Sequence, residues 1–451
     1  MELLKSFLHF KHELGKNAFN KLLLVQIFKT SIVKFFAILI SLIYVPLTLK
    51  YLDQEKYGIW ITLTTITNWM ALFDIGIGNG LRNKPAEAIA LNDLKLGKSY
   101  VSTTYAFLGT IFLFALLLFH FLNPLINWQS LLNTKSISHN ELYLITSVVI
   151  SFVILRFILQ TVTVVDAANG DSAQSGVLLL IISSISLLFI FLAIQFSEKG
   201  NLFLLAVILT GVPIIVYIIY SIIVFRKKHK IFKPDLKTVN KIHSKSLVGL
   251  SLQFFVVQIT ATILYSSIPF VITQLFGPNE VTQFSIANSI FSLPIMLISL
   301  VCAPALPFIT QAKAKGDIAW LKSTLKRLTF ISYLFCIGTI ILVAFSGFIY
   351  RLWIGDKVEI PFYLSLSLGI YTIINLLVNP YSNFINGLGN VKILTILAPV
   401  GIAMFIGFSI YFAHLFKNVY GISIALSLTS IVGLIVLPIH VKRELNKLRP
   451  K

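Results

Sequence analysis

The sequence predicts an all-α integral membrane protein with about 12 transmembrane helices, in two six-helix lobes that form parallel repeats. Of its 451 residues, 57% are apolar and only 12% are charged, whereas soluble domains are about 45–50% apolar and about 25% charged. Too few charged residues remain to cover a surface that faces water. Apolar runs of membrane-spanning length, about 20 residues each, recur from Leu22 to His440, which excludes a single anchor attached to a soluble domain.

The individual spans follow from length and apolarity. Each predicted helix contains about 20 mostly apolar residues, and a polar or basic segment separates it from the next. Prolines interrupt some of the spans, at Pro46, Pro213, Pro269 and Pro294, where we expect bends. The predicted spans lie near residues 25–49, 57–80, 99–122, 141–165, 174–195, 202–225, 247–275, 282–309, 329–350, 360–386, 393–416 and 419–441.

The basic residues indicate which way the chain crosses the membrane. With the N-terminus inside, the tails and the even-numbered connections hold 27 of the 37 Lys and Arg residues, while the odd-numbered connections hold seven. Cytoplasmic connections are enriched in Lys and Arg, so we expect both termini in the cytoplasm. This rule explains the basic excess without a nucleic acid partner.

A long basic connection, residues 226–246, divides the chain into two halves. Because six spans return the chain to the same side, the second half enters the membrane in the same orientation as the first, as in transporters built from parallel repeats. Pro46 and Pro269 are 223 residues apart, and Ala88, Ala90 and Asp93 match Ala312, Ala314 and Asp317 at an offset of 224. The expected units are a cytoplasmic segment 1–21, a lobe 22–225, the connection 226–246, a lobe 247–441 and a cytoplasmic tail 442–451.

Four ionisable side chains lie inside predicted spans of the first half. Their distances from the cytoplasmic ends of their spans, at about 1.5 Å per residue, are roughly 6 Å for Lys29, 9 Å for Asp74, 13 Å for Lys34 and 14 Å for Arg156. A charge at mid-membrane costs at least about 2.5–3.5 kcal/mol, so each needs a partner, water or a route to the interface. Lys29 can extend to the headgroups and Asp74 can neutralise one neighbour. At least one deep cation then remains without an acidic partner.

The predicted spans of the second half contain no charged side chain, and their polarity comes from amides. Asn375, Asn379, Asn383 and Asn386 recur at spacings of four, four and three, which places them on one face of a helix. Such a stripe can form hydrogen bonds between helices, typically worth about 0.6 kcal/mol each. It can also line a path for sugars, because amides match hydroxyl groups without adding charge.

The second predicted span ends in a glycine-rich stretch, Phe73–Asn83, with glycines at 76, 78 and 80. These glycines allow close packing of helices. Alternatively, they make an irregular helix end that presents backbone N–H groups and Arg82 to an anionic group at the cytoplasmic mouth. No strand precedes the stretch, so it does not match a phosphate-binding GxGxxG loop.

Motifs of enzymes are absent from the sequence. It contains no HExxH, GxSxG or P-loop pattern and no acidic pair in a loop of useful size. Cys302 and Cys336 lie in apolar runs without the spacing of metal ligands or a disulfide, so we interpret them as core residues. We therefore expect a protein that is not an enzyme, with no catalytic residue, no metal site and no cofactor.

Three stretches resemble a known family. Tyr51–Trp60, together with Phe73–Asn83 and Ala86–Ala88, looks like the opening of bacterial polysaccharide-export proteins of the O-antigen flippase (Wzx-like) kind. Asn379-Pro380 followed by Phe384–Gly389 is similar to the tenth-span signature of that group. These proteins belong to the multidrug/oligosaccharidyl-lipid/polysaccharide exporter superfamily, and the likeness in topology covers essentially the whole chain.

The resemblance implies two lobes that form a V around a cavity open alternately to the cytoplasm and the periplasm. The implied cargo is an undecaprenyl-pyrophosphate-linked oligosaccharide, flipped across the bacterial inner membrane for cell-surface polysaccharide synthesis. Membrane lipids, and the polymerase and glycosyltransferases of the same pathway, are the implied partners. Lys29, Lys34, Arg82 and Arg156 are then the candidate cations for the pyrophosphate, Asp74 their counter-charge, and the amide stripe the candidate sugar contact.

Two other classes stay open. A cation-coupled multidrug exporter of the same superfamily should need unpaired acids in the membrane, yet Asp74 is the only acid well inside a predicted span. A membrane-bound glycosyltransferase or polymerase would need catalytic residues in a substantial outer loop. The longest outer connection, near 123–140, contains Lys135 and no acid, which argues against this class more strongly.

Overall fold

In the part of the chain that the computed structural model describes, all regular secondary structure is helical. This part comprises residues 18–70, 88, 93–169, 171, 174–240, 266–389 and 392–447, with the backbone alone described for 18–31, 303, 304, 307, 392 and 398. Within it, ten helical segments are long and apolar enough to cross a bilayer. The other two predicted spans, 57–80 and 247–275, run into residues 71–87 and 241–265, which lie outside the described residues. The chain is therefore a multi-pass membrane protein, as predicted.

The first half of the chain forms one bundle of long helices. Polar residues cap several helix starts: Asp53 accepts a hydrogen bond from the Lys56 backbone N–H at 2.7 Å, and Asn201 accepts one from that of Leu204 at 2.9 Å. Such caps satisfy N–H groups that have no partner within the helix. The helices are α2 (Ala18–Tyr51), α3 (Gln54–Trp69), α5 (Leu94–Leu122), α6 (Trp128–Leu131), α7 (His139–Gln160), α8 (Val162–Ala168), α9 (Gln174–Phe196) and α10 (Leu202–Ile223).

The second half forms a similar bundle after a structured connection. That connection consists of a π-helical turn, η3 (Val224–Lys228), and two 3-10 turns, η4 (Lys230–Phe232) and η5 (Leu236–Thr238). The helices that follow are α12 (Ile268–Phe276), α13 (Pro278–Phe291), α14 (Leu293–Lys315), α15 (Ile318–Ala344), α16 (Ser346–Ile354), α17 (Phe362–Leu388), α18 (Lys392–Phe416) and α19 (Tyr420–Lys447).

Some helix boundaries differ from those expected from hydropathy. The span predicted near 329–350 begins at Ile318, because the Asp317 carboxylate caps a polar first turn, and it ends at Ala344. The span near 282–309 is two helices, α13 and α14, separated at Ser292 before a proline. Hydropathy finds the apolar middle of a helix, whereas caps and prolines decide where the helix begins, ends and breaks.

The two halves repeat the same local structure at the offset found in the sequence. The Asp93 side chain caps α5 by accepting from the Leu96 N–H at 2.9 Å, and 224 residues later Asp317 caps α15 in the same way, also at 2.9 Å. The backbone N–H of each aspartate donates to an alanine carbonyl five residues earlier, that of Ala88 or Ala312, at 2.9 Å. Shared hydrogen bonds at one offset support the internal repeat.

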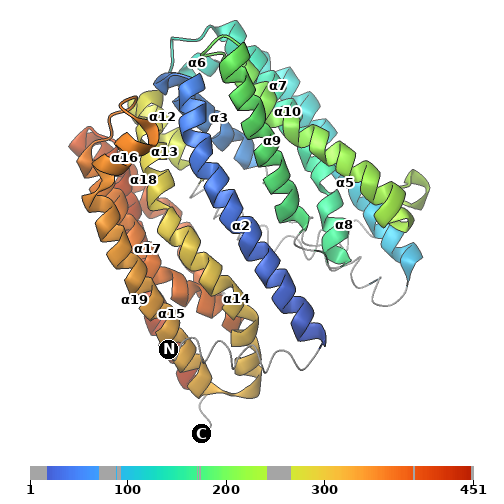
Figure 1. Ribbon diagram of the computed structural model, residues 1–451, viewed down its shortest axis with the longest axis vertical. Coiled ribbons are helices and arrows are strands. Elements are labelled where there is room, and N and C mark those ends of the chain that lie inside the picture. Colours follow the sequence, from blue (N-terminus) through green and yellow to red (C-terminus); the bar gives the residue numbers. More distant parts are fainter. Residues whose placement is uncertain are drawn as a thin grey trace.

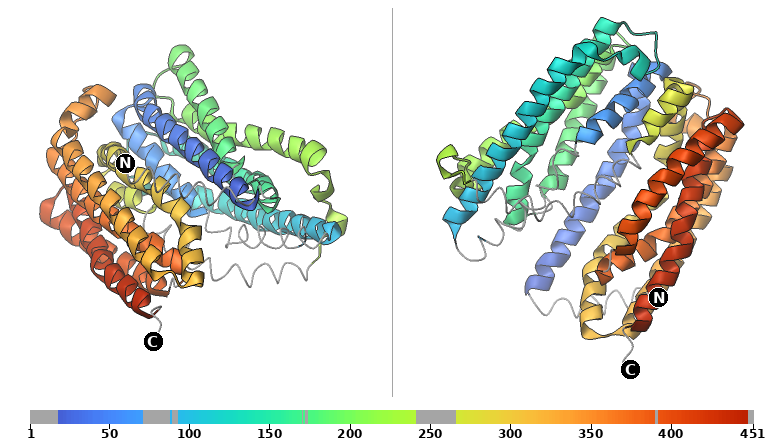
Figure 2. Two further views of the ribbon diagram at one scale, coloured as in Figure 1. Left: turned by 60° about the horizontal axis from the view of Figure 1, so that its bottom comes forward. Right: turned by 180° about the vertical axis from the view of Figure 1, so that it is seen from behind.

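The two bundles converge at one end and diverge toward the other (Figure 1). At the converging end α3 of the first lobe meets α12 and α13 of the second. The view from behind shows the same divergence, with α2 between the lobes (Figure 2). The described start of α2, the end of α19 and the connection after α10 all lie at the diverging end.

The hydrophobic core is shared between the lobes at the converging end and divided between them at the diverging end. One large cluster crosses from lobe to lobe at the converging end, where Ile59 and Leu63 of α3 join Val281 and Phe284 of α13. Toward the other end each lobe has a separate cluster: one around Tyr217 in the first lobe, and others in the second. The lobes therefore share a core at only one end of the described structure.

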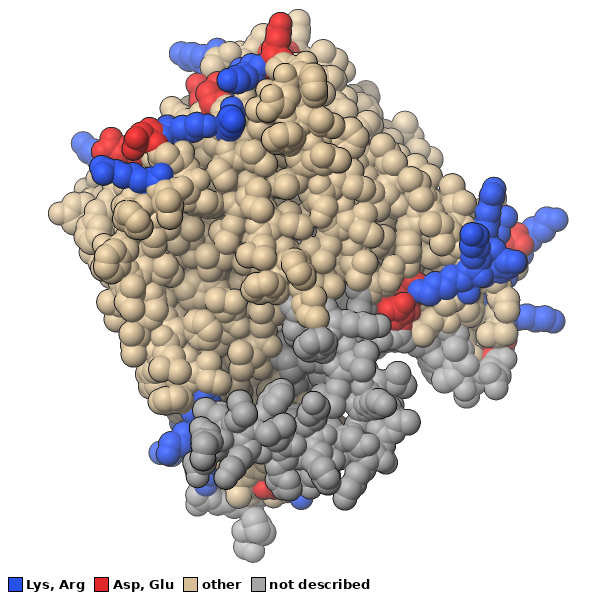
Figure 3. Space-filling view, in the orientation of Figure 1, with Lys and Arg blue, Asp and Glu red and all other residues tan. Residues whose placement is uncertain are grey.

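Charged side chains mark the two ends, and a belt without charged side chains lies between them (Figure 3). At the converging end, Lys and Arg are interspersed with Asp and Glu. At the diverging end, basic residues of the α10 connection gather in a dense group. We call the diverging end the basic end.

Candidate substrate pathway

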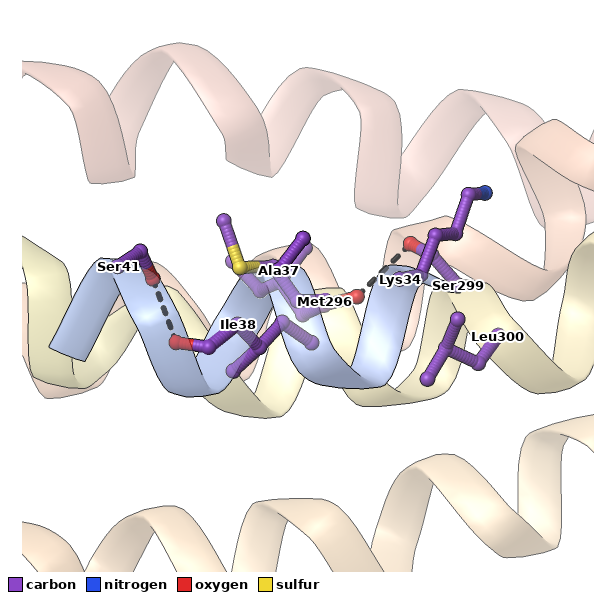
Figure 4. A pocket seen from close by; sticks show the side chains of 8 residues that line it. Lys34, Ala37, Ile38, Ser41, Met296, Ser299 and Leu300 are labelled. Atoms are coloured by element: carbon purple, nitrogen blue, oxygen red, sulfur yellow. Dashed lines mark hydrogen bonds between the residues drawn. The ribbon is translucent and has the colours of Figure 1, made fainter. Parts of the chain in front are cut away.

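Lys34 lies at the seam between the two lobes. It lines a cavity of about 380 Å³ with Met296 and Ser299 of α14, and the other lining residues are mainly apolar. Lys34 and Ser299 lie at one end of this cavity, and Ser41 at the other (Figure 4). Nearer the converging end the Trp353 indole N–H donates to the Leu42 carbonyl at 2.7 Å and holds α2 to the second lobe. The described structure therefore places a cation where two lobes meet with space between them.

Arg156 lies elsewhere in the first lobe, where α7 packs against α10. Its charge acts on the nearby Tyr217 hydroxyl of α10. The Arg156 Nε is buried and has no hydrogen-bond partner among the described residues. No described contact joins Lys34 to Arg156, so the structure does not bring the two deep cations into one pocket.

Three of the other candidate residues cannot be placed with their side chains. Lys29 lies on α2, where only the backbone is described. Asp74 and Arg82 lie outside the described residues. Neither Lys34 nor Arg156 forms an ion pair with a described residue. The pairing of one of them with Asp74 stays a prediction.

The amide stripe lies on α17, as the spacing predicted. The Asn383 side-chain amide donates to the Asn379 side-chain oxygen at 2.9 Å, so these two form a pair along the helix. The Asn375 amide donates to the Tyr371 carbonyl at 2.9 Å and, at 3.5 Å, to Ser430 of α19. Asn386 is exposed, and the other three are half-buried. Asn375 thus serves helix packing in part through Ser430, whereas the described hydrogen bonds of Asn379 and Asn383 lie within α17 and Asn386 is exposed.

At the converging end α3 and α13 form a contact that we call the seal. The Thr282 hydroxyl donates to the Gln54 carbonyl at 2.6 Å, and a Cβ on Gly58 would lie only 1.8 Å from the Pro278 carbonyl oxygen. At the repeat offset of 224, Gln54 corresponds to Pro278 and Gly58 to Thr282. The contact is therefore reciprocal between the two repeats, as in an isologous interface.

Further hydrogen bonds between the lobes reinforce the seal. The hydroxyls of Thr62 and Thr273 lie 2.6 Å apart and are both buried. The Asn133 side-chain amide donates to the Thr273 carbonyl at 2.9 Å, and that of Gln274 donates to the Leu131 carbonyl at 2.7 Å. The short segment around α6 thus closes over the end of the seal.

The seal was not identified from the sequence, although a signal was present. Gly58 belongs to the Tyr51–Trp60 stretch that carries the family resemblance, whereas no motif singles out its counterpart Thr282. Extending the 224-residue offset to α3 would have paired Gly58 with Thr282. It would not have shown that the two touch, because a repeat does not specify how its copies pack.

A buried carboxylate near the basic end was also missed. Asp166 of α8 is fully buried and accepts hydrogen bonds from the Tyr220 hydroxyl at 2.7 Å and the Lys228 ammonium at 2.8 Å. Lys228 also contacts Asp171 at 3.0 Å. This network ties the start of the basic connection to α8, so the acid has a structural counter-charge.

The described residues contain no cluster of His, Cys, Asp and Glu arranged to hold a metal ion. Cys302 and Cys336 are free and buried, in agreement with their interpretation as core residues. The arrangement can instead separate two aqueous sides at the seal and accept a group at the seam. These are the elements of a carrier with a gated path.

Comparison with known proteins agrees with this architecture. The family model of polysaccharide biosynthesis proteins matches residues 23–313, and that of MatE matches residues 254–412. A protein of Salmonella typhimurium named "Putative O-antigen transporter" is 23% identical over 360 residues, which cover 78% of this chain and 80% of that protein.

Solved structures show the same fold. An inward-facing multidrug resistance MATE family transporter of the MOP superfamily superposes with a TM-score of 0.77 at 14% identity, covering 93% of this chain and 98% of that one. An outward-facing structure of such a transporter gives 0.65 at 13% identity, covering 94% and 96%. The lipid II flippase MurJ, in an inward closed conformation, gives 0.69 at 19% identity, covering 93% and 89%. The two-lobe fold is thus shared with these proteins. Because the family model of polysaccharide biosynthesis proteins matches most of the sequence, the chain belongs to that family.

Proposed function

We propose that this protein flips an undecaprenyl-pyrophosphate-linked oligosaccharide across the bacterial inner membrane by alternating access, for the synthesis of a cell-surface polysaccharide. Its relatives named for O-antigen transport and the structural likeness to a lipid II flippase support this cargo class. On this proposal the protein is a transporter and not an enzyme. The polymerase and glycosyltransferases of the same pathway are its functional partners.

The observation that carries the proposal is Lys34 at the seam between α2 and α14. A lipid-linked sugar has a long apolar tail that stays in the bilayer, so its headgroup has to enter between the lobes from the side. The seam cavity has apolar walls with one ammonium group. Such a site suits a pyrophosphate attached to a lipid, because the ammonium group can compensate the anionic charge while the apolar walls contact the lipid.

Arg156 and the amides of α17 complete the proposed path. Arg156 carries a buried Nε without a described partner, which leaves donor capacity for a phosphate oxygen. The exposed surface of Asn379, Asn383 and Asn386 can exchange hydrogen bonds with sugar hydroxyls. One lobe thus supplies positive charge and the other supplies neutral polar groups.

In this proposal the basic end faces the cytoplasm, both termini are cytoplasmic, and the described state is closed toward the periplasm. The charge distribution supports this orientation, since cytoplasmic connections are enriched in Lys and Arg. A cysteine at Lys237 should then be protected from an impermeant thiol reagent in intact cells, while one at Ser130 should react. The reverse labelling pattern would contradict the orientation.

The proposal is tested by deleting the gene and measuring undecaprenyl-linked repeat units, which should accumulate. The intact gene should clear them, Lys34→Ala should lose most of this export, and Lys34→Arg should keep much of it. Lys322→Ala, an exposed lysine of α15 at the basic end, serves as the matched control and should export normally. A deletion strain without accumulated intermediates would overturn the cargo assignment.

A cation-coupled multidrug exporter is the second candidate, favoured by the MATE likeness. Such a carrier needs an acid free to bind a cation or a proton within the membrane. Asp166, the fully buried acid of the described spans, already binds Lys228 and Tyr220. Sensitivity of the deletion strain to cationic dyes, without accumulated intermediates, would support the exporter instead.

A further inference from the structure

The connection after α10 is folded against the first lobe along α5. The Phe232 ring is buried where Gly97 has no side chain: a Cβ there would lie 2.8 Å from the ring. The Ser102 hydroxyl accepts a hydrogen bond from the Asp235 backbone N–H at 3.0 Å and one from the Thr238 hydroxyl at 2.8 Å. The connection up to residue 240 is therefore part of the first lobe.

Charged contacts hold the inward side of the same segment. The Lys98 ammonium donates to the Asp235 carboxylate at 3.1 Å, and the Lys228 ammonium donates to Asp166 at 2.8 Å. The backbone N–H of Lys237 and the Lys98 ammonium keep the pKa of Asp235 below its usual value, so this carboxylate stays ionised at neutral pH. The acids near this segment, Asp166, Asp171 and Asp235, are thus each paired with a lysine.

The outward side of the segment combines positive charge with apolar side chains. Ile231 is 55% exposed and Leu236 is 85% exposed. Basic residues surround them in sequence, and all are exposed: Arg226, Lys227, Lys230, Lys233 and Lys237. We call this face, residues 226–237, the basic arm. No described residue covers Leu236, which leaves its side chain free to enter an apolar environment.

The basic arm continues the apolar surface of α10 that faces lipid. Ile215, Ile219 and Ile222 are 59%, 53% and 47% exposed on the last turns of α10, directly before Arg226. The same arrangement is visible where the tan belt ends and the blue group begins (Figure 3). The arm therefore lies at the level where hydrocarbon gives way to headgroups.

From this placement we propose that the basic arm binds anionic phospholipid headgroups of the leaflet at the basic end, with Ile231 and Leu236 inserted among the lipids. Clustered lysines next to a membrane span attract anionic lipid, and apolar side chains between them add burial in the interface. Because the arm is fastened to α5 and α8, binding fixes the first lobe in the leaflet. The second lobe can then move against an anchored partner.

Insertion is tested with a spin label on the full-length protein. The buried Cys302 and Cys336 are replaced by alanine, and the label is attached at Leu236→Cys or, as control, at Asp356→Cys, an exposed site at the converging end. In vesicles of phosphatidylcholine with phosphatidylglycerol, the label at 236 should become accessible to oxygen and protected from a polar nickel reagent. The label at 356 should stay accessible to nickel. A label at 236 that remains water-exposed would overturn the proposal and favour a soluble acidic partner.

Charge is tested by a matched pair of triple variants. In the arm variant, Lys230, Lys233 and Lys237 are replaced by glutamine. In the control variant the same replacement is made at three exposed lysines at the basic end of the second lobe, Lys315, Lys322 and Lys326. Added phosphatidylglycerol should raise the thermal unfolding midpoint of the control as in the parent protein. The arm variant should lose most of that rise. An equal loss in both variants would show a general effect of net charge and would overturn a specific role of the arm.

Discussion

Replacing Gly58 by alanine should open the seal. Gly58 lies in the first turns of α3, where alanine is the better helix former by about 1 kcal/mol, so the helix itself does not suffer. The added Cβ would lie 1.8 Å from the Pro278 carbonyl oxygen and 3.0 Å from the Thr282 hydroxyl, where ordinary contact begins at 3.4 Å. The near atom is backbone, so the lobes have to separate by about 1.6 Å at this point.

The expected shift in the equilibrium follows from the contacts that a separation breaks. Two hydrogen bonds between the lobes, from Thr282 to Gln54 and between Thr62 and Thr273, are both 2.6 Å long. Each typically contributes about 0.5–1.5 kcal/mol, and forcing a methyl group into a packed site costs about 1–3 kcal/mol. The sealed state can accommodate the methyl group in either way, so the two costs are alternatives and do not add. A shift of about 1–3 kcal/mol changes the ratio of sealed to open molecules roughly 5- to 150-fold.

The opening is measured as a distance between the lobes. Spin labels at Lys135, near α6, and at Asn279, at the start of α13, lie on exposed positions on either side of the seal. With Cys302 and Cys336 replaced by alanine, double electron-electron resonance should show an additional population of Gly58→Ala molecules with a longer distance between the two labels. Export should fall, because a carrier held open on one side cannot complete its cycle.

Two glycine variants serve as controls. Gly421→Ala brings a Cβ to 2.7 Å from the Phe412 carbonyl within the second lobe, so it should lower thermal stability without changing the distance between the lobes. Gly109→Ala meets nothing within 4 Å and should change neither. An unchanged distance distribution in Gly58→Ala would refute the assignment of the seal.

Three further changes test the rest of the pathway. Arg156→Ala should lose most export at normal protein abundance while Arg156→Lys is intermediate, because a lysine keeps the charge but cannot bind phosphate bidentately; normal export in both variants would make the guanidinium structural. Replacing Asn379 and Asn383 by leucine should lower export while membrane insertion stays normal, and unchanged export would assign the stripe to helix packing. Asp166→Asn should lower thermal stability in detergent by roughly 1–3 kcal/mol through the weakened bond to Lys228, and an unaltered unfolding midpoint would contradict this.

The spans were predictable because hydropathy is a local property of the sequence. A bilayer requires about 20 apolar residues per helix wherever they occur, so the runs predicted near 174–195 and 393–416 agree closely with α9 and α18. The predicted boundaries were wrong where polar residues extend a helix past its apolar part, as in α15, which begins directly after Asp317. The break between α13 and α14 also depends on local chemistry, since Pro294 lies two residues after Ser292, in the first turn of α14.

The candidate site was predictable in part. Depth along a helix singled out Lys34 and Arg156, because an ionised group is costly anywhere in the hydrocarbon. Depth does not specify direction around the helix or the neighbouring helix. These two properties come from the packing of the helices. In the structure, the two cations lie apart, with Lys34 at the seam with α14 and Arg156 against α10.

The sequence by itself determined the membrane class, the helical content and the repeat, since each depends on residue types at short spacing or at one constant offset. Only the tertiary structure decided that Gly58 meets Pro278, that Asp166 is buried beside Lys228, and that Phe232 fills the space at Gly97. These contacts join residues that are 62 to 220 positions apart. Their formation depends on how whole helices pack, which is set by the summed burial of many side chains and not by the pattern of any single segment.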